Sequence, residues 1–200
     1  MTFTVRHLLT YTLLFTVLFI IGLFSGFDFI TTTILSHNSK GFDLIMSVLT
    51  KWAEWPVIVL SLTLSFYVLG RKGWFWAAAF ALEGLIIQGA KNWFNWPRPA
   101  VRFPEFVRTI DGNALSQWKA FPSGHTAAVF FATAIIFSLW QTKWPRIFRI
   151  ILLLLAFLVA YSRIYLGQHS FEDVLAGGLA GLWLYWAFHK LFQHKNWLES

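Results

Sequence analysis

Cysteine is absent from the 200-residue chain. Its absence excludes disulfide bonds, cysteine-ligated zinc, iron–sulfur clusters and thiol catalysis. Charged residues are scarce too, at 12% of the chain, whereas soluble domains carry about 25%. Hydrophobic residues make up 57%, and the mean hydropathy is +0.59, which excludes a disordered chain, a coiled coil and an ordinary water-soluble domain. The composition therefore indicates a polytopic membrane protein.

Acidic residues are fewer than basic ones, 9 against 16, and the formal net charge is +7. In a soluble protein this excess would suggest nucleic-acid binding. Here the basic residues lie between the apolar runs instead of forming a patch. Anionic lipid is therefore the expected partner, and no nucleic acid is expected.

The apolar runs predict the fold. A bilayer core about 30 Å thick needs roughly 20 apolar residues for each spanning helix. Six runs approach this length, at about 8–27, 55–70, 74–91, 123–140, 147–166 and 171–192. We therefore expect an all-α, polytopic membrane protein, with six transmembrane helices in a single integral-membrane domain over residues 1–200. Interfacial segments are expected between spans one and two and between spans three and four.

The basic residues of the short loops predict the orientation. With six spans, Arg6, Arg71 and Lys72 fall on one side together with the cluster at 143–149 and the C-terminal lysines. Each side carries eight Lys and Arg, so the raw count does not decide, but on this side they lie in the short loops, and the positive-inside rule then favours it as the cytoplasmic side. We therefore expect a plasma-membrane or inner-membrane protein with both termini cytoplasmic. Tryptophans near the expected span ends, such as Trp74 and Trp76, suit an aromatic belt.

Several chemically active side chains gather at one membrane face. The end of an odd-numbered span and the start of the next lie on the same side, here the extracytoplasmic one. The residues at these positions are Lys91, Ser123, Gly124, His125, Arg163, His169 and Asp173, and Arg98 lies in the adjoining connection.

Three of these residues, Lys91, Arg98 and Arg163, are cations that suit phosphate oxygens. Ser123 is placed to cap a helix whose first N–H groups could bind an anion, with no side chain on Gly124 in the way.

The two histidines complete a catalytic set. His169 and Asp173 are spaced i, i+4, which puts them on one helical face if the helix starts that early. A carboxylate that accepts a hydrogen bond from one imidazole nitrogen fixes the tautomer and leaves the other nitrogen free to attack. His125 supplies a second imidazole for proton transfer.

Three segments carry a resemblance to a known family. Lys91 to Pro99 matches KxxxxxxRP, Pro122 to His125 matches PSGH, and Ser162 to Asp173 matches SRxxxxxHxxxD. In this order they resemble the signatures of the type 2 phosphatidic acid phosphatase superfamily. The four fixed positions of the last motif match a random window on the order of once in 10⁵.

The resemblance implies a lipid phosphatase that needs no metal or other cofactor and forms a phosphohistidine. By matching positions, His169 resembles the nucleophile, Asp173 its orienting partner and His125 the acid for the leaving oxygen. The phosphate cradle would be Lys91, Arg98, Ser123, Gly124 and Arg163. Among lipids, undecaprenyl pyrophosphate is favoured, with phosphatidylglycerophosphate, phosphatidic acid and lipid A phosphates left open.

Other polar residues are given structural interpretations. Glu83, in mid-span, is expected to form an interhelical hydrogen bond rather than to act in catalysis. Gly177 and Gly181, spaced GxxxG, are expected to allow close helix packing. His7, His37, His189 and His194 are interpreted as interfacial side chains. Arg102 and Arg108 could contact a second phosphate or a headgroup sugar, or could equally pair with Glu105 or Asp111.

Other functions remain to be weighed against hydrolysis. A phosphotransferase could pass the phosphoryl group from the same phosphohistidine to another lipid. A small transporter fits less well, because the charged groups lie at one face instead of near the bilayer midplane. A metal-dependent hydrolase is disfavoured, since HExxH does not occur. The sequence leaves the oligomeric state open.

Overall fold

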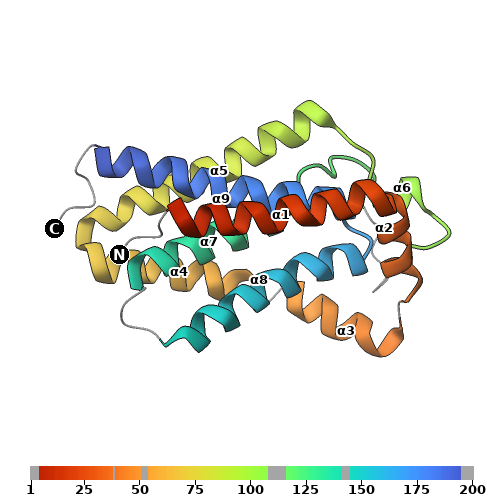
Figure 1. Cartoon of the computed structure of the whole chain (residues 1–200), viewed down its shortest axis with the longest axis horizontal. Coiled ribbons are helices and arrows are strands. Elements are labelled where there is room, and N and C mark those ends of the chain that lie inside the picture. Colours follow the sequence, from red (N-terminus) through yellow and green to blue (C-terminus); the bar gives the residue numbers. More distant parts are fainter. Residues whose placement is uncertain (1–4, 38, 51–53, 108–115, 141–144, 195–200) are drawn as a thin grey trace.

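The computed structural model describes residues 5–37, 39–50, 54–107, 116–140 and 145–194. Within these ranges every regular element is a helix, as the composition predicted (Figure 1). The long helices are α1 (Val5–Ser25), α4 (Glu54–Leu69), α5 (Gly73–Phe94), α7 (Gly124–Trp140), α8 (Arg146–Tyr165) and α9 (Phe171–His194). Each of them covers one of the six predicted spans.

The connections contain shorter helices. Between α1 and α4 the chain forms α2 (Phe27–Ser36) and α3 (Lys40–Val48), and a 3₁₀ turn, η2 (Gly70–Lys72), precedes α5. After α5 comes α6 (Pro99–Arg102). The α1 and α2 axes differ by 90° at Gly26, whose φ of +82° lies in the region that favours glycine. This bend turns α2 across the end of the bundle, the direction that an interfacial segment requires.

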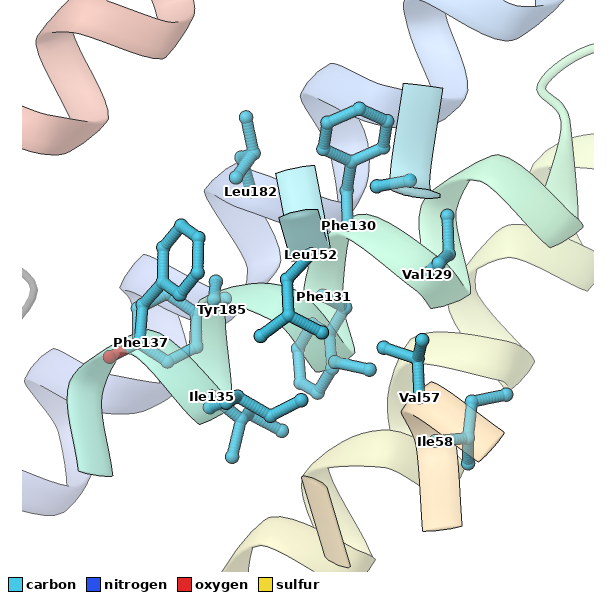
Figure 2. Close-up of a cluster of buried hydrophobic side chains, with 14 of the residues drawn as sticks. Val57, Ile58, Val129, Phe130, Phe131, Ile135, Phe137, Leu152, Leu182 and Tyr185 are labelled. Carbon is cyan, nitrogen blue, oxygen red and sulfur yellow. The ribbon is translucent and has the colours of Figure 1, made fainter. Parts of the chain in front are cut away.

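Helix α7 forms the centre of the bundle. Its side chains from Ala127 to Ile136 are almost all apolar and buried around the whole helix, as expected for a core element. Figure 2 shows Phe130, Phe131 and Ile135 of α7 among Val57 of α4 and Leu182 of α9. The continuous apolar run in the sequence therefore marks a helix enclosed by other helices.

Small residues let α9 approach α7 closely. A Cβ atom on Gly177 would lie 2.4 Å from the carbonyl oxygen of Ser123, and one on Gly181 would lie 2.3 Å from that of Ala127. Both separations are too short for any side chain. The close packing predicted for this GxxxG pair is confirmed, and it brings the start of α7 against the start of α9.

The bundle exterior is apolar. Large side chains such as Leu13, Phe24 and Leu85 are more than half exposed, which suits lipid rather than water. Among the described helices, Arg146–Tyr165 is long and apolar enough by itself to cross a membrane, and the bent pair Leu9–Ser25 and Phe27–Ser36 meets the same test together. The count of six spans therefore stays a prediction.

An aromatic cluster near the start of α5 corrects two expectations. Trp76, expected in the interfacial belt, is 1% exposed and stacks on Tyr185 with ring centroids 5.2 Å apart. His189, expected to be interfacial, is 6% exposed and stacks on the same indole. Both residues face the contact between α5 and α9, where burial of aromatic surface outweighs any preference for the interface. His37 and His194 are exposed, as expected, and the side chain of His7 lies outside the described residues.

Candidate active site

The polar residues singled out in the sequence gather at the end of the bundle that carries α6. Figure 1 shows the end of α8 and the start of α9 near this end, and the start of α1 and the end of α9 near the other. The close packing of α7 on α9 and the turn between α8 and α9 build the site.

The turn after α8 places His169. Gly167 has a φ of +65°, and a Cβ atom there would lie 2.9 Å from Val107, so both the backbone and the space require glycine. The N–H groups of Gln168 and His169 both donate to the carbonyl oxygen of Arg163, at 3.0 and 3.1 Å. These bonds fold the turn back onto the last turn of α8. His169 is thereby buried at 2% exposure.

Asp173 ties this turn to the start of α9. Its Oδ2 accepts a hydrogen bond from the backbone N–H of Ser170 at 2.8 Å, the acidic half of a capping box. The same Oδ2 lies 3.6 Å from Nδ1 of His169, slightly beyond hydrogen-bonding distance. Because α9 begins only at Phe171, the expected i, i+4 helical pair is instead a contact between a helix and the turn before it.

The PSGH segment begins α7 beside this pair. Ser123 donates its backbone N–H to the carbonyl oxygen of Asp173 at 2.9 Å, so the starts of α7 and α9 are directly joined. The carbonyl oxygen of Ser123 accepts the N–H of Ala127 at 3.0 Å, which places Ser123 at the predicted N-cap position. Its hydroxyl, which is buried, accepts a hydrogen bond from the hydroxyl of Thr126 at 2.9 Å.

The three cations of the predicted cradle are held by uncharged groups. Nζ of Lys91 donates to the carbonyl oxygen of Lys119 at 3.1 Å, and a Cβ atom on Gly124 would lie 3.5 Å from Cε of Lys91. Lys91 therefore lies over the glycine at the start of α7.

Arg98 donates to Oε1 of Gln168 at 3.0 Å and to the carbonyl oxygen of Trp118 at 3.1 Å. Arg163, 7% exposed, donates to the hydroxyl of Thr50 at 2.7 Å. None of these contacts is to a carboxylate, so both guanidinium charges are held without being cancelled by these partners.

Electrostatics link His169 to this ring of cations. Burial lowers the pKa of His169 well below its ordinary value, and the positive charges of Arg163, Lys91 and Arg98 lower it further, with a smaller effect from His125. The charges of the three predicted cradle cations and of His125 therefore all act on this imidazole. At neutral pH it is uncharged, as a nucleophile must be.

Arg102 does not form the ion pair that the sequence suggested. Its guanidinium forms ion pairs with Asp28 of α2 and Glu172 of α9, not with Glu105, and it donates to the hydroxyl of Ser170 at 3.1 Å. Ion pairing with two carboxylates leaves it little capacity for a second phosphate. Arg108 and Asp111 lie outside the described residues. Glu83 is 2% exposed, so it is buried within the bundle, and its hydrogen-bonding role stays a prediction.

Sequence reasoning missed the residues that hold the cations. Gln168 directly precedes His169 in the motif, and this adjacency could have drawn attention to it. Thr50 and Asp28 carry no such signal. They contact Arg163 and Arg102 because α2 and α3 fold back toward this end of the bundle.

Comparison with solved structures defines the class of fold. LpxE from Aquifex aeolicus aligns with a TM-score of 0.63 at 26% identity, covering 80% of this chain and 93% of its own. A transmembrane PAP2-type phosphatidylglycerolphosphate phosphatase from Bacillus subtilis aligns with a TM-score of 0.68 at 23% identity, covering 94% and 96%. The bundle therefore has the fold of a transmembrane phosphatase.

The sequence comparisons place the chain within a family. Residues 72–197 match the model of the PAP2 superfamily. Undecaprenyl-diphosphatase BcrC of Bacillus subtilis is 30% identical over 145 residues, which cover 70% of each protein. The chain belongs to the PAP2 superfamily and is a lipid phosphatase of that family, as the three motifs indicated.

Proposed function

We propose that this protein hydrolyses a lipid phosphate or diphosphate through a phosphohistidine formed on His169, without a metal ion. The observation that carries the proposal is the burial of the His169 imidazole 3.6 Å from Asp173, and the charges of Lys91, Arg98 and Arg163 act on the same imidazole. Phosphoryl transfer depends mainly on such positioning and charge stabilisation.

In the first step Nε2 of His169 attacks phosphorus, because Nδ1 faces Asp173. The N–P bond forms as the bond from phosphorus to the leaving oxygen breaks, and His125 gives that oxygen a proton. The negative phosphate offsets the nearby cations, so the proton on His125 is tolerated once substrate is bound. The carboxylate of Asp173 stabilises the positive charge on the phosphorylated imidazole.

In the second step a water molecule attacks phosphorus and the N–P bond breaks. His125, now neutral, accepts the proton of the water, and inorganic phosphate leaves. The three cations and the first N–H groups of α7, at Gly124 and His125, balance the phosphate charge in both steps. Ser123 positions those groups through its bond to the Asp173 carbonyl oxygen.

Among lipid substrates we favour undecaprenyl diphosphate, because BcrC matches across 70% of both proteins. Hydrolysis of a diphosphate would release the lipid monophosphate as the leaving group. Phosphatidylglycerophosphate, phosphatidic acid and lipid A phosphates are the alternatives. The predicted orientation places the site on the extracytoplasmic face of the cell membrane.

A panel of these lipid phosphates, assayed with purified protein for released phosphate, tests the proposal. His169→Ala is expected to abolish release, and His125→Ala to lower kcat about 10²- to 10⁴-fold. His194→Ala, at the far end of α9, is the matched control. Full release by His169→Ala would overturn the nucleophile assignment, and loss of activity in a chelator would overturn metal independence.

Product analysis separates hydrolysis from the two other functions weighed. A phosphorylated acceptor lipid in place of free phosphate would show a phosphotransferase. Flux of intact substrate into proteoliposomes that persists in His125→Ala would show a transporter.

A further inference from the structure

A cavity of about 780 Å³ opens beside the candidate active site. Its walls come from α1, the α1–α2 corner, α9 and the two ends of the connection between α5 and α7. The apolar lining includes Phe19, Phe27, Trp96, Phe121, Leu175 and Leu179. Trp96 and Phe121 form one wall, with ring centroids 4.6 Å apart. A pocket of this size and composition suits an apolar ligand.

Three residues of the cavity lining are close in sequence to predicted phosphate-site residues. Pro97 precedes Arg98, and Phe121 lies two residues before Ser123. Glu172 lies next to Asp173. The cavity lining therefore lies one or two residues along the chain from Arg98, Ser123 and Asp173.

Arg102 bridges the charged edge of the cavity. It joins Asp28, whose side chain is 61% exposed, to Glu172, whose side chain is 12% exposed. Two carboxylates against one guanidinium leave this edge with an excess negative charge, which repels a second phosphate group. The ligand chemistry that fits is therefore hydrocarbon on the inner side, with the phosphate held elsewhere.

We propose that this cavity binds the part of the substrate's hydrocarbon chain nearest the phosphate, and that Arg102 is a positioning residue which ties the cavity edge to the His169 turn. The proposal rests on the proposed function. Its ligand is the chain of the lipid phosphate itself, and the occupied cavity makes the enzyme selective for long-chain substrates.

The contacts of Arg102 explain how it acts on His169. Its partners Ser170 and Glu172 flank the turn in which the N–H of Ser170 is bound by Asp173. The His169–Asp173 contact is 3.6 Å, so a small movement of this turn decides whether the hydrogen bond forms. A chain that fills the cavity packs against Glu172 and holds the turn in place.

A cavity-filling pair of variants tests the chain site. Ala176 lines the cavity, whereas Ala187 lies on an exposed face of the same helix. We expect Ala176→Trp to lower kcat/KM about 10- to 100-fold for a C55 diphosphate and to leave a short-chain, water-soluble phosphate ester unaffected. Ala187→Trp should change neither. If Ala176→Trp does not fold, Ala176→Phe replaces it.

Equal effects on both substrates, or none on either, would overturn the chain site. Failure of the wild-type protein to hydrolyse any lipid phosphate would instead refute the proposed function, so the two failures are distinct.

Arg102 is tested by separating kcat from KM. Arg102→Gln is expected to remove the advantage in kcat that a long chain gives over a short one, and Arg102→Lys should restore part of it. A residue that only stabilises the fold would lower kcat for both chain lengths by the same factor. That result, or a change confined to KM, would refute the positioning role.

Discussion

Two uncharged side chains hold the arginines of the candidate site. Thr50 accepts a hydrogen bond from Arg163, and Gln168 accepts one from Arg98. A carboxylate in either place would neutralise the guanidinium and lower its attraction for phosphate. In these two contacts a hydroxyl and an amide orient the guanidinium groups without adding a negative charge of their own.

Removing the hydroxyl of Thr50 isolates this effect. Thr50→Val keeps the shape of the side chain but leaves Arg163 without this acceptor, and a hydrogen bond to a charged group contributes about 1.5–3 kcal/mol. We expect kcat/KM for phosphate release to fall roughly 10- to 100-fold. Thr50→Ser, which retains the hydroxyl, is the control and should remain close to wild type. Equal activity in the valine and serine variants would contradict this role.

The protonation state of His169 can be predicted over a range of pH. Its pKa is lowered by burial and by the neighbouring cations, so it should show no protonation by NMR between pH 7.5 and 6. A histidine of ordinary pKa, about 6.5, would be mostly protonated by pH 6. The His169→Gln spectrum identifies the signal. A midpoint near 6.5 would contradict the buried, uncharged state.

The lowered pKa of His169 also makes the free energy of unfolding depend on pH. Because the folded-state pKa is below the unfolded value, the unfolded chain binds more protons between the two. The contribution of His169 to the free energy of unfolding is therefore complete above about pH 6.5 and decreases as the pH falls below it.

At the scale of helices, the packing of α9 on α7 sets the site geometry. Ser123 lies where Gly177 approaches, and its N–H bonds to the Asp173 carbonyl oxygen. The glycine spacing predicted the close approach. The short helices α2 and α3 were less predictable, because residues 28–51 mix apolar and polar side chains without a span-length run.

Adding methyl groups along this contact should separate the two helices. Gly177→Ala and Gly181→Ala would each place a Cβ atom less than 2.5 Å from a carbonyl oxygen, that of Ser123 or of Ala127. Overpacking of this kind costs about 1–3 kcal/mol, so the melting temperature in detergent should fall. Gly84→Ala is the control, because a Cβ atom there would meet nothing within 4 Å. An unchanged melting temperature for Gly177→Ala would contradict the close packing.

For the whole molecule, the sequence predicted the long helices because each is a separate apolar run between polar breaks. It predicted the grouping of the motif residues because alternate span ends share a face. It could not predict that Arg102 would pair with Asp28 and Glu172, since these residues come from three elements far apart in sequence. The contact with Asp28 also depends on the 90° bend after α1, where Gly26 has a φ of +82°.

The absence of cysteine makes the predicted orientation directly testable. Any introduced cysteine is the sole thiol of the chain. Arg71 and Ser116 are both exposed, one in the turn between α4 and α5 and the other in the connection before α7. If the basic short loops face the cytoplasm, a membrane-impermeant maleimide applied to intact cells should label Ser116→Cys and spare Arg71→Cys until the cells are opened. The reverse pattern would place the phosphate site inside the cell, where a lipid headgroup would reach it only from the cytoplasmic leaflet.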